Sequence, residues 1–422
     1  MTKKIYLDNA ASTPVDEKVK KEMEPYFSEI FGNPGSIHSF GQEAQIGVDK
    51  ARRKIADFLN CQSQEIIITA SATEANNLAL KGVIGAFTKK DFIPHIITSA
   101  FEHESILEPC RQLEKIGSAE ITYLPVSKDG FVNPEDVKNA LKDNTVLVSV
   151  MYANNEIGTV QPIFEISRII TDFKKRKSEI RNPSAFGGSA SGGKSETNSK
   201  FKIQNSKFGA ALPLLHTDAV QAVQFLNCDV QKLGVDLLSL SGQKIYGPKG
   251  VGALFVRSGV KIEPLVSGGI QEGGLRGGTE NVPGIVGLGA AVALAAENQK
   301  AGVSAKIEKL TNKLTEGILK NVKGASLNGA KENRLPNNAN ILFKGVSSEM
   351  LIIALDSEGI VVSAGSACSA KALKSSHVLR AIGLSEKDAS SSLRFTLSKH
   401  TTEEEINFVL RKMPEIINKL NK

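Results

Sequence analysis

Short apolar runs, many of them β-branched, alternate along the chain with longer stretches whose apolar positions recur at helical spacing. The short runs have the length and composition of buried strands. We predict strands at 66–69, 95–98, 121–124, 146–150, 212–216, 235–240 and 251–256, with helices such as 48–59 and 104–115 between most of them. This alternation indicates an α/β fold with a mainly parallel central sheet flanked by helices.

The pattern changes after residue 256. A Gly-rich segment at 267–278 is followed by long helical periodicity over 285–321 and then by a new set of strands and helices. We therefore predict a large domain at 15–256 and a smaller α+β domain at 257–422. We assign the N-terminal segment 1–14 to the smaller domain, although it could pack with either one.

Composition and charge narrow the class of protein. The 422 residues are 41% apolar and 23% charged, which excludes general disorder. The net charge of +7 would suggest a nucleic-acid or acidic membrane partner, but residues 171–215 hold nine basic and three acidic residues, so six of the seven charges lie there. This stretch is rich in Ser, Gly and Lys. We predict a flexible surface insertion at about 177–211, with a partner-binding arm as the alternative, and no direct nucleic-acid contact.

The spacing of the cysteines and the sequence of the N-terminus predict the cellular compartment of the protein. Cys61, Cys110, Cys228 and Cys368 form no C-x-x-C pair, so neither a zinc site nor a disulfide framework is indicated, and we expect no resident metal. The N-terminus lacks the apolar core of a signal peptide, and no run of 18 apolar residues follows. We predict a cytoplasmic protein without a membrane partner.

Two predicted strands end in residues that suit a cofactor. In open α/β sheets, ligands bind where loops leave the carboxyl ends of the strands. Lys244 follows one such strand, and Asp218 and Gln221 follow another. Pyridoxal phosphate needs a lysine to bond covalently and a carboxylate against its pyridine nitrogen. Taken singly, Lys244 could be a solvated charge and Asp218 a helix N-cap.

Three further strand ends add polar groups to the same rim. Ser71 precedes an apparent helix whose free backbone N–H groups suit a phosphate, with a capping box between Ser71 and Glu74 as the alternative. His103 could stack on a planar cofactor and move protons, or simply face solvent. Asn155 offers an amide donor after the strand at 146–150.

Two residues near the C-terminus suit a substrate. Alternation over 393–397 places Arg394 opposite three apolar side chains, where its guanidinium could hold a substrate carboxylate or form a surface ion pair. Cys368 lies in a small-residue stretch, 363–370, that could form a mobile loop. The alternative for Cys368 is a buried apolar role.

Together these segments resemble cysteine desulfurases of the iron–sulfur-cluster type, in the class V aminotransferase group of fold-type I pyridoxal-phosphate enzymes. The resemblance extends from residue 6 to beyond residue 400, with the basic insertion as the main interruption. The matching segments are 6–11, 31–34, 72–74, 102–103, 154–158, 216–221, 244–250, 276–279, 365–368 and 392–395.

The resemblance implies a role for each site residue. Lys244 would hold pyridoxal phosphate, Asp218 would pair with the pyridine nitrogen, and Gln221 would contact the ring hydroxyl. His103 would stack on the ring, and Asn155 would help to place the substrate and the ring hydroxyl. The phosphate would be bound by Ala72, Thr73 and Ser241, and also by Thr279, which would reach the other subunit of a homodimer.

Gln243 departs from this pattern, because the family usually has His immediately before the cofactor lysine. A glutamine keeps a neutral hydrogen-bond donor for the phosphate but cannot titrate near pH 7. We therefore expect Gln243 to contribute to cofactor binding, and any proton relay through this position to be lost.

The resemblance also implies a reaction. L-cysteine, held by Arg394, would be converted to L-alanine while Lys244 and His103 move protons and Cys368 receives the sulfur as a persulfide. The attacking species is a thiolate, so the Cys368 proton needs an acceptor, for which His103 is the candidate. The sulfur would pass to an acceptor or scaffold protein for iron–sulfur cluster assembly or another thiolation pathway, and Cys368 could bind transiently to a cluster on that partner.

Two alternatives stay open at this point. A related aminotransferase or selenocysteine lyase would share the cofactor site, with Cys368 incidental. A cofactor-free sulfur-handling or scaffold protein would share the fold, with Gln243 marking a decayed site.

Overall fold

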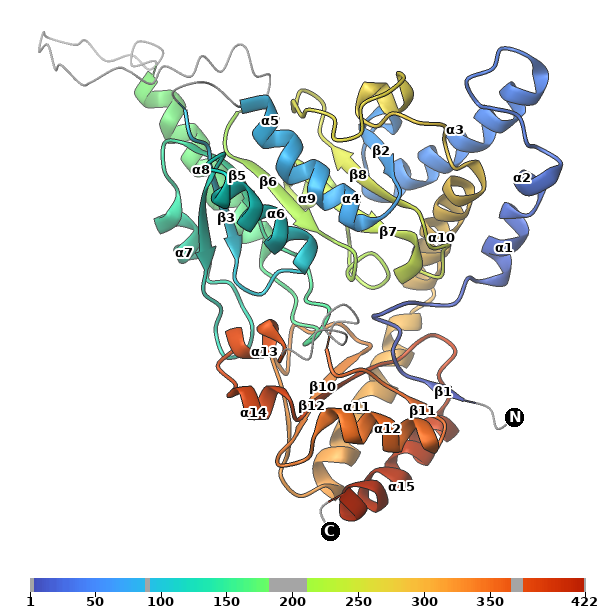
Figure 1. Ribbon diagram of the computed structural model, residues 1–422, viewed down its shortest axis with the longest axis vertical. Helices are drawn as coiled ribbons and strands as arrows, with labels where there is room; N and C mark the ends of the chain where they lie inside the picture. Colours follow the sequence, from blue (N-terminus) through green and yellow to red (C-terminus); the bar gives the residue numbers. More distant parts are fainter. Residues whose placement is uncertain (1–3, 88–91, 182–210, 366–374, 421–422) are drawn as a thin grey trace, which may run out of the picture.

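The computed structural model describes residues 4–87, 92–181, 211–365 and 375–420 (Figure 1). Its largest element is a seven-stranded sheet of order β2-β8-β7-β6-β5-β3-β4. All seven strands predicted from the sequence are present, with ends that move by two residues or fewer. Their bounds are β2 Ile66–Thr69, β3 His95–Ser99, β4 Glu120–Leu124, β5 Thr145–Ser149, β6 Leu214–Asp218, β7 Leu237–Ser241 and β8 Gly252–Val256.

The sheet is mainly parallel, as predicted. Only β8 runs against its neighbours, β2 and β7, whereas the other adjacent pairs are parallel. The carboxyl ends of six strands therefore meet at one edge of the sheet. This edge carries the residues that the sequence singled out.

Helices cover both faces of the sheet because successive strand residues point to opposite sides. Ile66 and Ile68 of β2 belong to one apolar core and Ile67 to the other. The first core includes residues of α3 (Ser39–Leu59), α8 (Ile163–Arg181) and α10 (Val282–Lys300), and the second includes α4 (Ala72–Asn77), α5 (Val83–Phe87) and α6 (Glu104–Lys115). A π-helical turn at Leu78–Gly82 joins α4 to α5. The shorter helices are α1 Glu17–Met23, α2 Pro25–Ser28, α7 Pro134–Ala140, α9 Val230–Leu233, α13 His377–Ala381 and α14 Glu386–Ala389.

A smaller sheet, β12-β10-β9, lies below the large one in Figure 1. Its strands are antiparallel, and its core includes residues of α11, α12 and α15. The N-terminal segment joins this part: β1 pairs in parallel with β11, and Leu7 is buried in the same core. The bounds are β1 Ile5–Tyr6, β9 Ala325–Leu327, β10 Asn338–Phe343, β11 Ile360–Val361, β12 Ser392–Thr396, α11 Val303–Asn321, α12 Ser348–Ser357 and α15 Glu403–Leu420.

The helical periodicity over 285–321 belongs to two helices rather than one. α10 ends at Lys300 and α11 begins at Val303, and between them Gly302 has a φ of 69°. This left-handed conformation, which glycine adopts without strain, breaks the helix. α10 packs in the core of the large sheet and α11 in the core of the small sheet, so the chain passes from one core to the other near Gly302. The domain division at residue 257 stays a prediction.

The basic stretch is partly regular structure. The predicted insertion at about 177–211 begins with helix rather than with flexible chain, because α8 continues to Arg181, and the amine of Lys177 donates to the Asp143 carbonyl at 2.6 Å. Where the insertion starts stays a prediction. Residues 182–210 lie outside the described part of the chain. No helix among the described residues is long and apolar enough to cross a membrane.

Candidate active site

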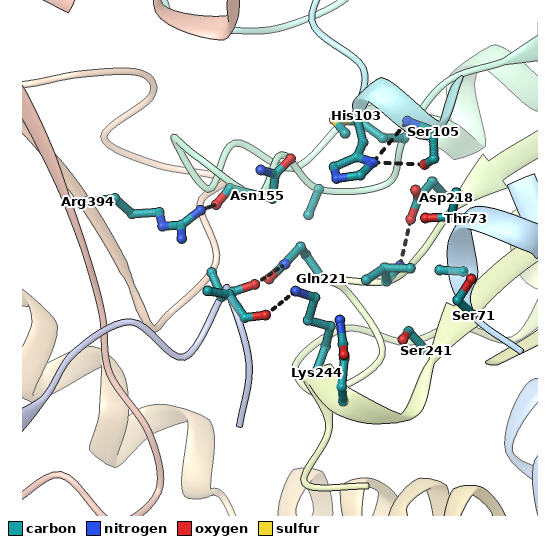
Figure 2. Close-up of a pocket in the computed structure, with 17 residues that line it drawn as sticks. Ser71, Thr73, His103, Ser105, Asn155, Asp218, Gln221, Ser241, Lys244 and Arg394 are labelled. Atoms are coloured by element: carbon teal, nitrogen blue, oxygen red, sulfur yellow. Dashed lines mark hydrogen bonds between the residues drawn. The ribbon is translucent and has the colours of Figure 1, made fainter. Parts of the chain in front are cut away.

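One pocket, with a volume of about 230 Å³, gathers the residues that follow the strands (Figure 2). In Figure 2, His103 and Lys244 lie on opposite sides of the open space, Arg394 lies at one end, and Asp218 and Thr73 lie at the other. Ten of the predicted site residues line this pocket. They are Ala72, Thr73, His103, Asn155, Asp218, Gln221, Ser241, Gln243, Lys244 and Arg394.

Lys244 reaches the pocket from a short 3₁₀ turn, Gly242–Lys244, directly after β7. Its amine donates to the backbone carbonyl of Ala11 at 2.5 Å, and the Gln221 amide donates to that of Ala10 at 3.1 Å. The backbone of Gln243 accepts the N–H of Thr13 at 2.9 Å. The N-terminal segment therefore forms one wall of the pocket and touches the predicted cofactor lysine.

Asp218 is the last residue of β6 and does not cap a helix. Its Oδ1 accepts the Val220 N–H at 3.0 Å, and its Oδ2 accepts the Asn76 amide at 2.7 Å. Both carboxylate oxygens are thus held by donors from the protein. The sequence reasoning identified Asp218 but missed Asn76, whose only sequence signal is its place four residues after Ala72.

His103 is the N-cap of α6, and it is half-buried rather than solvent-facing. Its Nδ1 accepts the Ser105 N–H at 3.1 Å and lies 2.8 Å from the Ser105 hydroxyl. In the neutral ring these contacts assign the proton to Nε2. Burial lowers the pKa of His103. The structure therefore favours a neutral His103 that donates from Nε2, and taking up a proton at Nδ1 would displace Ser105.

The first turn of α4 provides a cradle for a phosphate. The Ser71 hydroxyl caps the helix by accepting the Glu74 N–H at 3.2 Å, while the Glu74 carboxylate accepts the Ala70 N–H instead of completing the reciprocal capping box. The N–H groups of Ala72 and Thr73 have no partner within the helix and are available to an anion. Gly252 permits this approach, because a Cβ there would lie 2.9 Å from the Ala72 nitrogen.

Arg394 lies on β12 and is only 1% exposed, so the surface ion pair is excluded. It donates to the Asp8 carboxylate at 2.7 Å and to the Asn155 carbonyl at 2.9 Å. Its Nε has no hydrogen-bond partner among the described residues. A buried donor without a partner is costly, so this nitrogen calls for an acceptor from a bound molecule. Asp8, like Asn76, was missed as a site residue.

Among the described residues, one predicted site residue does not line the pocket. Thr279 is exposed, and its predicted contact with another subunit stays a prediction. Cys368 lies outside the described residues. Burial raises the pKa of each described cysteine, Cys61, Cys110 and Cys228, to about 12, so none of these three thiols is suited to act as a nucleophile. The described residues also contain no cluster of His, Cys, Asp or Glu placed to hold a metal ion.

Glu102, next to His103, is a buried acid that sequence reasoning passed over. It is inaccessible to solvent, its carboxylate accepts the Met151 N–H and the Ser99 hydroxyl, and burial raises its pKa to about 8. Ser99 is the last residue of β3 and Met151 follows the neighbouring strand β5, so Glu102 links the ends of these two strands.

The fold and the pocket define a pyridoxal-phosphate-dependent enzyme of fold type I. The residues present fit this cofactor: Lys244 supplies the amine, Asp218 the carboxylate for the pyridine nitrogen, and the first turn of α4 the phosphate cradle. Arg394 lies at the far end of the pocket, where a substrate would bind.

The chain belongs to the aminotransferase class-V family, whose model matches residues 5–176 and 205–409. It is 44% identical to the cysteine desulfurase IscS of Dictyoglomus turgidum, with 100% of this chain and 96% of that protein covered. A solved structure named as a NifS-like protein is 36% identical, with 99% and 100% covered and a TM-score of 0.84. A structure of SspA in complex with cysteine is 35% identical, with 94% and 100% covered and a TM-score of 0.74.

Proposed function

We propose that this chain is a pyridoxal-phosphate-dependent cysteine desulfurase that converts L-cysteine to L-alanine and transfers the sulfur to Cys368. The observation that carries the proposal is the pocket itself. It places Asp218 at one end, the buried Arg394 at the other, and Lys244 at the side of the space between them. Among the described residues, no acceptor binds the Arg394 Nε. The full-length similarity to cysteine desulfurases supports the same activity.

Each pocket residue has a task in this reaction. Pyridoxal phosphate, when bound, withdraws electrons from the substrate so that its Cα proton can leave and its carbon–sulfur bond can break. The Arg394 guanidinium holds the substrate carboxylate, and Asn155 helps to place the substrate. Lys244 moves protons at Nζ, and His103 lies against the cofactor ring and donates from Nε2. Asp218 keeps the pyridine nitrogen protonated.

The sulfur transfer balances without an external oxidant. The Cys368 thiolate attacks the substrate sulfur, and a sulfur–sulfur bond forms as the carbon–sulfur bond breaks. The electron pair of the broken bond stays with the carbon skeleton, which takes up a proton at Cβ and leaves as L-alanine. Cys368 keeps the sulfur as a persulfide, and a thiol reductant releases it as sulfide.

An assay with L-cysteine and a thiol reductant tests the proposal. Sulfide and alanine should form in equal amounts, and Cys368→Ala should abolish both while the visible absorption of the bound cofactor stays unchanged. Lys244→Ala should lose both the products and the absorption of the lysine-bound cofactor. Unchanged sulfide release by Cys368→Ala would favour the aminotransferase or selenocysteine lyase reading, and failure to bind pyridoxal phosphate would favour the cofactor-free one.

We further propose that the enzyme is a cytoplasmic homodimer that passes its sulfur to an acceptor or scaffold protein for iron–sulfur cluster assembly or thiolation. The resemblance of segment 276–279 supports the dimer, in which Thr279 contacts the cofactor phosphate of the other subunit. Sedimentation of the holoenzyme tests the dimer. Titration of the Thr279→Ala apoprotein with pyridoxal phosphate tests the contact, which predicts weaker binding.

A further inference from the structure

Asn76 is a fully buried polar side chain that connects two residues of the pocket without lining the pocket itself. Its Nδ2 donates to the Asp218 carboxylate at 2.7 Å and to the Ser105 hydroxyl at 2.8 Å. The Ser105 hydroxyl in turn lies 2.8 Å from Nδ1 of His103. One amide group therefore links the residue at the pyridine nitrogen to the residue that faces the cofactor ring.

The chemistry of these partners determines how the amide is oriented. An ionised carboxylate can only accept hydrogen bonds, so the group that faces Asp218 must be the NH₂ of Asn76 and not its oxygen. Because the second N–H is donated to Ser105, the serine hydroxyl directs its own proton to His103. The Oδ1 of Asn76 has no hydrogen-bond partner among the described residues, so the two donated bonds are the hydrogen bonds that orient the side chain there.

The backbone around Asn76 is suited to hold it rigidly. It lies in the second turn of α4, directly before the π-helical turn at Leu78–Gly82, and such turns are frequent at functional sites. The adjacent Asn77 is half-buried, and among the described residues its side chain donates only to the Thr73 carbonyl of its own helix, at 2.9 Å. The two neighbouring asparagines thus differ in burial and in partners, which makes Asn77 a matched control.

We propose that Asn76 is a positioning residue that orients the Asp218 carboxylate toward the cofactor's pyridine nitrogen and, through Ser105, holds the ring of His103 against the cofactor. The inference rests on the cofactor site of the proposed function and not on desulfuration. Without Asn76, one Asp218 oxygen loses its donor and the carboxylate is free to turn away from the ring. The ring nitrogen then carries less positive charge.

Cofactor binding by the full-length apoprotein tests this role in the absence of cysteine. Asn76→Ala should raise the dissociation constant of pyridoxal phosphate about 10-fold or more, because a hydrogen bond to a buried charge is lost. The pH midpoint of the visible band should rise by about one unit, since a less positive ring makes the nitrogen that joins Lys244 to the cofactor more basic. Ser105→Ala, which cuts only the branch to His103, should shift both quantities less.

Two variants separate positioning from a purely structural effect. Asn77→Ala should match the wild type in both measurements. Asn76→Asp keeps the shape of the side chain but sets one carboxylate against another, so it should weaken binding in the same way and gives an answer even where the alanine variant does not fold. If Asn76→Asp, or a folded Asn76→Ala, binds pyridoxal phosphate like Asn77→Ala and with the same pH midpoint, the inference is wrong. A wild-type protein that does not bind the cofactor would instead overturn the proposed function.

Discussion

The Asp8–Arg394 ion pair offers a direct test of how the substrate end of the pocket is held. Its atoms lie 2.7 Å apart, and the side chains are 16% and 1% exposed. Asp8→Ala removes the only carboxylate that pairs with Arg394 among the described residues. The guanidinium is then left in the protein interior with the Asn155 carbonyl as its remaining acceptor.

The expected cost follows from the burial of the pair. Removing one partner of a buried ion pair destabilises a protein by about 3–5 kcal/mol, because a charge is left without compensation. Asp8 is partly exposed and the Asn155 carbonyl still accepts one bond, so we expect about 2–3 kcal/mol for Asp8→Ala. Asp8→Asn retains an acceptor oxygen and should cost about 1 kcal/mol.

Urea unfolding of the cofactor-free protein, followed by circular dichroism, measures these differences in the free energy of unfolding. Asp356→Ala is the matched control, because its pair with Lys4 spans 3.4 Å with both side chains more than half exposed. It should cost less than about 1 kcal/mol. High salt should reduce the effect of Asp356→Ala further and leave that of Asp8→Ala nearly unchanged. Equal costs for the two alanine variants would refute the reasoning.

Three further predictions concern other parts of the chain. Burial raises the pKa of Glu102 from 4.5 to about 8, so its protonated form adds stability that is fully present below about pH 4.5 and is lost as the pH rises through 8. Glu102→Gln does not titrate, so the melting temperature of the wild type should fall relative to that of Glu102→Gln between pH 5 and 9. Iodoacetamide at pH 8 should label Cys368 first, because the three described thiols have raised pKa values; mass spectrometry of Cys368→Ala should show little labelling of the folded protein. Replacing 182–210 by a short Gly-Ser linker should leave sulfide production within about twofold, and a folded but inactive variant would contradict the view of this stretch as a passive insertion.

The large sheet could be predicted from sequence because its strands are buried on both faces. Such strands are continuous apolar runs, and all five residues of β5, β6, β7 and β8 are buried. The break between α10 and α11 at Gly302 could not be predicted from the apolar pattern. A single glycine interrupts helical periodicity only weakly in a sequence, whereas its left-handed φ separates α10 from α11 in the structure.

The pocket could be predicted only in part, for a related reason. Asp218 ends β6 and Lys244 closely follows β7, so the topology of a parallel sheet brings them together. Asn76 and Asp8 have no such local signal. Their partners lie 142 and 386 positions away in the sequence, and the contacts depend on how helices and the N-terminal segment pack around the sheet. Buried polar contacts of this range follow from tertiary structure and not from periodicity.

The N-terminal segment shows what such long-range contacts do for the site. Its first residues pair with β11 and bury Leu7 in the core of the small sheet, and Asp8 binds Arg394 on β12. Only a few residues later, the Ala11 carbonyl accepts the amine of Lys244 from the large sheet. One short stretch of chain therefore contacts both the residue proposed to bind the substrate carboxylate and the residue proposed to bond the cofactor. Because both contacts come from one segment, the N-terminal residues link the small sheet to the large one at the wall of the pocket.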